Sequence, residues 1–292
     1  MFPGFTPLRV NTGEVTIHAV RGGAGPPLLL LHGYPQTHAM WHKLAPRLAG
    51  RFTVVAPDLR GYGDSDKPPG DPAHMTYSKR AMARDMAALM AALGFECFAV
   101  AGHDRGARVA HRLCLDHPER VSRVAVLDIA PTHHMFATAD KVFGDAYYHW
   151  FFLSQPPDLP ERLIGADPAY YLRHKLAQWG RDPSAFTAEA VAEYTRCFSD
   201  PAAIHASCED YRAAATVDLE HDEADLGRKI ACPLLALWGS KSFIGRRYDV
   251  LAVWRERAAD VRGRALPSGH FLAEEAPDET YAELAAFFGE GA

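Results

Sequence analysis

The chain has 292 residues, of which 48% are hydrophobic and 23% charged, and its formal net charge is −5. This composition is typical of a globular protein, and the length fits one catalytic core that carries an insertion. A negative net charge supplies no basic field for a phosphate backbone, so we expect no nucleic-acid partner.

The cysteine and hydropathy patterns bear on compartment and cofactors. The five cysteines are odd in number and lack CxxC spacing, which argues against a disulfide framework and a zinc site. The N-terminal segment MFPGFTPLRVNTGEV lacks the basic and apolar regions of a signal peptide, and no apolar span is long enough for a bilayer. The histidines lack ligand spacing such as HExxH. We therefore expect a cytoplasmic protein with no membrane partner, no metal and no organic cofactor.

Short β-type runs alternate with helical patterns in the first part of the chain. Residues 14–20, 27–31 and 52–56 predict strands, and residues 78–93 have apolar side chains at helical spacing. The continuous apolar runs CFAVAGHD and RVAVLD are typical of central strands that are buried on both faces. This alternation predicts an α/β fold with a mostly parallel sheet flanked by helices.

The pattern changes after Pro131 to an aromatic and helical region without a clear strand. A strand signal returns at CPLLALWG, followed by a short strand near Ala265 and a final amphipathic helix from about Pro277 to Phe288. We therefore predict a core of residues 1–130, a helical cap of residues 131–216 inserted after the sixth strand, and the second part of the core in residues 217–292.

A strand-to-helix turn supplies the candidate nucleophile. The segment Gly102-His103-Asp104-Arg105-Gly106 follows a buried strand and precedes the helical pattern ARVAHRLCLDH. It matches the G-x-Nu-x-G elbow, whose glycines allow a tight turn that projects the central side chain. A carboxylate there is already ionised and can attack carbon without a base. The alternative is that Asp104 only caps the helix.

Covalent catalysis through a carboxylate requires a base and an acid to hydrolyse the ester. His270 follows the last predicted strand, where the chain order nucleophile, acid, histidine places the base. The acid could follow the strand after the nucleophile helix or the CPLLALWG strand. The second position has no carboxylate before Asp249, so we choose Asp128. The alternatives are a surface or packed His270 and a turn-capping Asp128.

The oxyanion that forms during ester hydrolysis needs backbone donors. In this type of fold they come from the residue after the nucleophile and from the loop after the third strand. The candidates are the N–H groups of Arg105 and Tyr34, with Gly33 allowing the HGYP loop to approach.

At this point the sequence resembles fluoroacetate and haloacetate dehalogenases of the α/β-hydrolase superfamily over nearly its full length. The segments that carry the resemblance are HGYPQTHAMWHK, DLRGYGDSDKP, GHDRGARVAHRL, AVLDIAPT, YHWFFL, CEDYRA and GHFLAEEAPDE. The resemblance implies a small haloacid as substrate, water as the second reactant, Asp104 as nucleophile, His270 as base and Asp128 as its partner. A homodimer is implied by family likeness only.

The same resemblance implies that Arg105 and Arg108 hold the substrate carboxylate. They lie three residues apart at a helix start and so share a face beside Asp104. Two anions about 4 Å apart repel by roughly 4 kcal/mol at an effective dielectric near 20, and two guanidiniums can offset this. The alternative is a pair of solvated helix arginines.

The resemblance assigns the departing halide to His149, Trp150 and Tyr211, whose N–H and O–H groups can converge on a small anion. The alternative is that the YYHWFF segment is only aromatic cap core. Some defluorinating relatives carry phenylalanine at the third position of HGYP, where this chain has Tyr34, so we expect a more polar pocket wall.

Two other functions fit parts of the pattern. Epoxide hydrolases share the elbow, the aspartate and the cap, and use cap tyrosines, for which Tyr147, Tyr148 and Tyr211 are candidates. The charged Arg105 beside Asp104 disfavours an apolar epoxide. A non-catalytic ligand receptor on the same fold is the third hypothesis, although it would not require nucleophile, base and acid together.

Overall fold

A single eight-stranded sheet forms the centre of the protein. The computed structural model describes residues 1–290, and the strand order is β1-β2-β4-β3-β5-β6-β7-β8. The pairs β1 with β2 and β2 with β4 are antiparallel, and all later neighbours are parallel, which confirms the predicted sheet. The strands are β1 (Thr6–Asn11), β2 (Thr16–Gly22), β3 (Pro27–Leu31), β4 (Thr53–Pro57), β5 (Phe98–His103), β6 (Val121–Leu127), β7 (Leu234–Gly239) and β8 (Val261–Leu266).

Strand β1 is absent from the sequence-based expectation. It lies at the edge of the sheet, and none of its side chains is fully buried. Its pairing with β2, from Thr6 opposite Arg21 to Asn11 opposite Thr16, defines it as a strand. An exposed edge strand lacks a buried face, so its hydrophobic pattern is weak.

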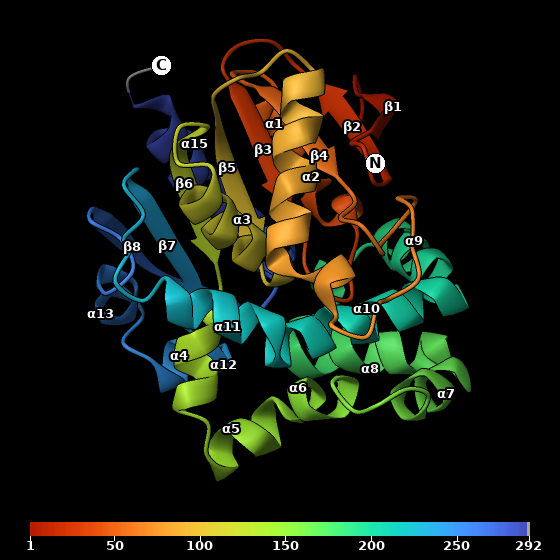
Figure 1. The fold of residues 1–292 in the computed structure, drawn as a ribbon. Helices are drawn as coiled ribbons and strands as arrows, with labels where there is room; N and C mark the ends of the chain where they lie inside the picture. The colour runs from red at the N-terminus through yellow and green to blue at the C-terminus, as the bar shows by residue number, and fades with distance from the viewer. Residues whose placement is uncertain (291–292) are drawn as a thin grey trace.

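Helices cover both faces of the sheet. In Figure 1, α2 and α3 lie in front of the sheet and α15 lies behind it. Helix α2 begins where the Ser78 side chain accepts a hydrogen bond from the Ala81 N–H, as an N-cap does. The helices of the core are η1 (His38–Trp41), α1 (Ala45–Leu48), η2 (Met75–Tyr77), α2 (Lys79–Ala92), α3 (Arg105–Asp116), α12 (Phe243–Arg247), α13 (Val250–Arg255), α14 (Leu272–Glu275) and α15 (Pro277–Gly289).

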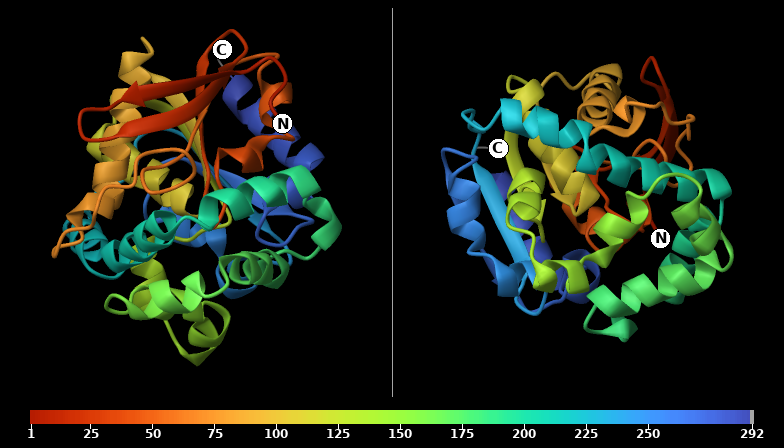
Figure 2. Two further views of the ribbon diagram at one scale, coloured as in Figure 1. Left: turned by 90° about the vertical axis from the view of Figure 1, so that its right-hand side faces the viewer. Right: turned by 60° about the horizontal axis from the view of Figure 1, so that its bottom comes forward.

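Between β6 and β7 the chain is helical and contains no strand within the described residues. Figures 1 and 2 show these helices gathered below one end of the sheet, where they form a cap. Helices flank residue 216 on both sides, so the predicted boundaries of the three parts stay a prediction. The helices are α4 (Thr132–Ala137), α5 (Lys141–Ala146), α6 (Tyr148–Leu153), α7 (Leu159–Gly165), α8 (Pro168–Trp179), η3 (Pro183–Ala185), α9 (Ala188–Phe198), α10 (Pro201–Ala215) and α11 (Val217–Ala224).

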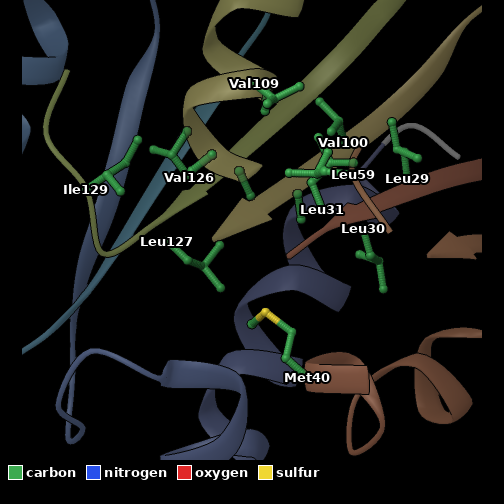
Figure 3. Packing of buried hydrophobic residues seen from close by; sticks show 14 of the residues in the cluster. Leu29, Leu30, Leu31, Met40, Leu59, Val100, Val109, Val126, Leu127 and Ile129 are labelled. Carbon is green, nitrogen blue, oxygen red and sulfur yellow. The ribbon is translucent and has the colours of Figure 1, made fainter. Parts of the chain in front are cut away.

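The hydrophobic core lies against the central strands. Leu29 and Leu31 of β3 pack with Val100 of β5 and Val109 of α3 (Figure 3). These side chains are fully buried, and close-packed apolar side chains of this kind form a rigid base for the ends of the strands. None of the helices within residues 1–290 combines the length and apolar character needed to cross a bilayer.

Candidate active site

Asp104 occupies the turn between β5 and α3. Its backbone has φ 47° and ψ −116°, a sparsely populated conformation for a residue other than glycine. A Cβ atom at Gly106 would lie 2.3 Å from the His32 carbonyl oxygen, so only glycine fits there. Burial opposes ionisation of Asp104, but nearby positive groups, His270 foremost, hold its pKa below the ordinary value. The carboxylate is therefore charged at neutral pH.

The HGYP loop approaches this carboxylate closely. The Tyr34 N–H donates to Asp104 Oδ1 at 2.9 Å. A Cβ atom at Gly33 would lie 2.4 Å from the Asp104 Cβ, so glycine is required for this approach. The Arg105 N–H is the first of helix α3, among the N–H groups that a helix leaves without an internal partner. Both predicted oxyanion donors therefore lie beside Asp104.

His270 and Asp128 lie together beneath the cap. The Nδ1 atom of His270 is 2.7 Å from Asp128 Oδ2, and its Nε2 atom is 3.8 Å from Asp104 Oδ2. Burial lowers the pKa of His270, but the hydrogen bond and charge of Asp128 and the charge of Asp104 raise it above the ordinary value. An imidazole with Nδ1 bonded to a carboxylate presents Nε2 to the reacting group. The three predicted residues therefore have the geometry of nucleophile, base and acid.

The backbone around His270 is held by Glu275. Its carboxylate accepts the N–H groups of Gly269, at 3.0 Å, and Phe271, at 3.0 Å. The same carboxylate accepts the Arg181 N–H from the cap at 2.8 Å. Residues on both sides of His270 are thus fixed by one side chain that also ties the cap to the core.

Two further backbone contacts hold His270 itself. Its N–H donates to the Trp179 carbonyl oxygen in the cap at 3.1 Å. His103 Nε2 lies 2.8 Å from the His270 carbonyl oxygen. Burial lowers the pKa of His103 to about 3, so that ring is neutral and its N–H donates to the carbonyl.

Arg105 is buried and has only one free position. Its Nε lies 3.0 Å from Asp210 Oδ2, and its Nη2 donates to the Asp210 carbonyl oxygen at 2.9 Å. Asp210 also accepts from Lys79 and from the Tyr62 hydroxyl. The Arg105 Nη1 is buried without a partner among the described residues. Only the Nη1 amino group of Arg105 is therefore left for a substrate, in place of the expected paired hydrogen bonds from two nitrogens, because a buried guanidinium also needs a fixed counter-ion.

Arg108 has a similar arrangement on the next turn of α3. Its Nη1 donates to the Ala130 carbonyl oxygen at 3.0 Å and to Thr132 Oγ1 at 2.9 Å. Its Nε is buried and, within residues 1–290, has no partner. No carboxylate forms an ion pair or hydrogen bond with this guanidinium in that range, and the carboxylate whose charge acts on it is Asp104. The pair is thus buried, and the alternative of solvated helix arginines is wrong.

The three residues assigned to the halide are buried and adjacent. The His149 and Tyr211 ring centroids lie 5.6 Å apart, and those of Trp150 and Tyr211 lie 6.5 Å apart. Arg105 lies 4.2 Å from the Tyr211 ring, and Arg108 lies 4.7 Å from the Trp150 ring. Burial and nearby cations hold the pKa of His149 well below its ordinary value, so its ring is neutral.

A cavity of about 190 Å³ reaches His270 between the cap and the core. Tyr147, Trp179 and Arg246 contribute to its lining. The basic lining residues Arg181 and Arg246 favour the approach of an anion to this cavity.

One group of metal-binding residue types lies apart from this site. The Asp58 carboxylate lies 3.0 Å from His18 Nδ1 and 2.9 Å from His38 Nδ1. It also accepts the backbone N–H groups of His38 and Asp64 at 2.8 and 3.0 Å. Four donors already surround its two oxygens, so the group fits a hydrogen-bonded loop anchor and we assign no metal to it.

Several residues of the site escaped the sequence analysis. Asp210 lies within the CEDYRA segment, but no local spacing indicates that it faces Arg105. Lys79, Trp179 and Glu275 are ordinary helix residues in the sequence. The partners of Lys79 and Trp179, and the Arg181 contact of Glu275, lie far away along the chain, so only folding brings these pairs together.

Comparisons with known proteins define the class. The alpha/beta hydrolase fold family model matches residues 26–277. A fluoroacetate dehalogenase of Burkholderia sp is 49% identical over 99% of this chain and 96% of its own. A soluble epoxide hydrolase of Corynebacterium sp. (strain C12) is 37% identical over 93% of both chains. The crystal structure of a protein from Nostoc sp PCC 7120 is 65% identical with a TM-score of 0.98, covering 98% of this chain and 99% of that one.

The fold, the elbow and the family match together define a hydrolase, and the chain belongs to the alpha/beta hydrolase family. Within that family it is similar over nearly its full length to the fluoroacetate dehalogenase, and epoxide hydrolases are also close relatives.

Proposed function

We propose that the protein hydrolyses small 2-haloacids such as fluoroacetate and chloroacetate to glycolate and halide. One observation carries the proposal: Arg105 Nη1 and Arg108 Nε are buried, have no partner within residues 1–290 and belong to cations that act on Asp104. A site that keeps such donors needs an anionic group on the substrate to satisfy them. The 49% identity to a fluoroacetate dehalogenase supports the same assignment.

In the first step an Asp104 carboxylate oxygen attacks the carbon that bears the halogen. A carbon–oxygen ester bond forms, and the carbon–halogen bond breaks with its electron pair on the halide. Arg105 and Arg108 hold the substrate carboxylate and offset its repulsion with Asp104. His149, Trp150 and Tyr211 receive the halide, and such donors contribute about 3 kcal/mol each at other preorganised sites.

In the second step water attacks the Asp104 carboxyl carbon. His270 Nε2 takes a proton from the water, and Asp128 stabilises the imidazolium. The oxyanion is received by the N–H groups of Tyr34 and Arg105, since Tyr34 already donates to this carboxyl group at 2.9 Å. His270 then returns the proton to the departing glycolate oxygen, the second water proton passes to solvent, and the Asp104 carboxylate is restored.

The test incubates the protein with fluoroacetate and chloroacetate and measures free halide and glycolate. We expect release of halide by the protein and none by Asp104→Ala. In His270→Ala, one halide per site should be released, and the ester should remain as a mass increment on the peptide that holds Asp104. Normal turnover by His270→Ala, or turnover without any adduct, would contradict the two-step mechanism.

A second candidate is hydrolysis of an epoxide by the same nucleophile. Tyr147 and Tyr211 are buried, and burial raises their pKa well above the ordinary value, so both phenols stay protonated and able to donate to an epoxide oxygen. The soluble epoxide hydrolase relative also favours it. Diol formation from styrene oxide without halide release from haloacetates would select this function, and tight binding with neither product would select a receptor.

A further inference from the structure

Lys175 is a buried cation that the proposed mechanism does not use. It lies on α8 and is fully buried. Its ammonium donates to the Tyr148 hydroxyl at 2.7 Å and to Gln178 Oε1 at 3.0 Å. It pairs with no carboxylate within the described residues, and burial alone lowers its pKa to about 7. Burying an ammonium without a counter-ion costs folding free energy. Groups with strongly shifted pKa values concentrate at functional sites.

Aromatic rings hold the ammonium in the cap. Its Nζ lies 3.9 Å from the centroid of the Tyr148 ring, 5.4 Å from that of Tyr171 and 5.2 Å from that of Trp179. Rings stabilise a cation through their negative faces but leave its charge uncompensated. The field of Lys175 therefore extends beyond this cage.

The aromatic cage around Lys175 adjoins the candidate halide pocket. The Trp179 ring, one wall of the cage, lies 4.6 Å from the His149 ring and 5.7 Å from the His270 ring. After burial itself, Lys175 is the largest cause of the lowered pKa of His149, ahead of His270, Arg105 and Arg108. Positive potential from Lys175 therefore reaches the ring that is assigned to the halide.

Negative charge moves during the first step of the proposed reaction. It begins on Asp104, and as the carbon–halogen bond breaks it collects on the halogen, on the cap side of the site. A fixed positive charge on that side stabilises the transition state more than the bound substrate, and this difference is what accelerates a reaction.

We propose that Lys175 is a positioning residue whose buried charge, set behind Trp179 and His149, stabilises the negative charge that develops on the departing halide. The inference rests on the proposed dehalogenase function. It assigns Lys175 to carbon–halogen cleavage and gives it no part in ester hydrolysis. The rate of carbon–halogen cleavage should depend most strongly on Lys175 when the halide is fluoride, because the poorest leaving group needs the most stabilisation of its charge.

The experiment isolates the first step in the His270→Ala background, in which each site releases halide once. Burst rates of halide release are measured with saturating fluoroacetate and chloroacetate, with and without Lys175→Met. We expect Lys175→Met to slow the burst about tenfold, the effect of a unit charge one side-chain layer away in a dielectric near 20. The substrate concentration for half-maximal rate should change less than twofold.

Matched variants separate charge from structure. Tyr148→Phe removes the hydrogen bond but keeps the ammonium over a ring, and Lys141→Met removes an exposed cap lysine. Both should leave the burst rate unchanged. Lys175→Arg keeps the charge and should recover most of the rate. Equal losses in Tyr148→Phe and Lys175→Met would show a structural role and overturn the proposal.

The pH dependence of the burst supplies a second readout. Lys175 loses its charge as the pH rises through about 7, so the burst rate should fall over that range to the level of Lys175→Met, whose own rate should stay flat. The Tyr148 and Tyr171 phenols, whose rings face the ammonium, have a raised pKa, and His149 has a lowered pKa, so none of these three changes charge near neutrality. His174, the next residue to Lys175 on α8, stacks on Tyr170 and is present unchanged in Lys175→Met, which controls for it. No charged group of α7 or α9, which also pack on α8, contributes to the Lys175 pKa.

The outcomes distinguish the two proposals. If His270→Ala releases no halide and forms no ester, the dehalogenase function is wrong. If the burst and ester form normally and Lys175→Met leaves the burst rate and its pH profile unchanged, only the role of Lys175 is wrong.

Discussion

The two oxygens of Asp128 serve two different parts of the molecule. One lies 2.7 Å from His270 Nδ1, and the other accepts the Gly239 N–H at the end of β7 at 2.9 Å. Asp128 itself has φ 52°, so its backbone is in the left-handed region immediately after β6. This hydrogen bond joins the end of β6 to the end of β7 and fixes the Asp128 carboxylate in the orientation that His270 requires.

Asp128→Asn should slow ester hydrolysis by about 10² to 10⁴-fold, because an amide neither stabilises the imidazolium nor fixes the imidazole in the required tautomer. The first halide burst should persist. Glycolate formation at steady state and the mass of the peptide holding Asp104 are the measurements. Asp249→Asn is the matched control, since Asp249 caps α13 and should leave the rate unchanged. Equal loss in both variants would argue against Asp128 as the acid.

The pKa of His270 should depend on Asp104. Burial lowers the pKa of His270, but Asp128 and then Asp104 raise it above its ordinary value. Asp104→Asn removes one of these charges, so the pKa should fall, and the neutral form should appear at lower pH. NMR titration of the His270 ring in both proteins measures this. An unchanged pKa would mean that the two side chains do not interact at 3.8 Å.

Glu275→Ala should slow hydrolysis of the ester about tenfold, because the backbone N–H groups on both sides of His270 lose their acceptor. The unfolding free energy should also fall by about 1–3 kcal/mol, the cost of leaving such donors unpaired. Burst and steady-state assays separate the two steps, and denaturant unfolding gives the stability. Asp278→Ala, at an exposed ion pair with Arg47, should change neither. A slower halide burst in Glu275→Ala would indicate a wider disturbance.

Gly33→Ala should reduce activity sharply and lower the unfolding free energy by about 1–3 kcal/mol, because the new Cβ overlaps the Asp104 Cβ at 2.4 Å. The oxyanion loop or the elbow must then move. Gly144→Ala in α5 is the control, because a Cβ there meets nothing within 4 Å. It should be neutral or stabilise by up to about 1 kcal/mol. Thermal unfolding and halide release compare the two, and full activity in Gly33→Ala would refute the close approach.

The sequence by itself determined the elements whose signals are local. The elbow around Asp104 depends on glycines beside it, and the strands β3 to β7 depend on continuous apolar runs with turn residues at their ends. Sterics and burial within a few residues fix such features. The position of His270 after the last strand also follows from the order of elements along the chain.

Tertiary structure alone decided which distant groups complete the site. Asp210 neutralises Arg105 across 105 residues, and His103 contacts the His270 carbonyl across 167. Lys175 contacts Trp179 one turn away on its own helix, but the contact of Trp179 with His149 joins two separate helices of the cap. The hydrogen bond from the Arg181 N–H to Glu275 joins the cap to the core. Electrostatic and hydrogen-bond partners are set by distance in space, and side-chain spacing along one helix or strand carries no information about the element that will face it.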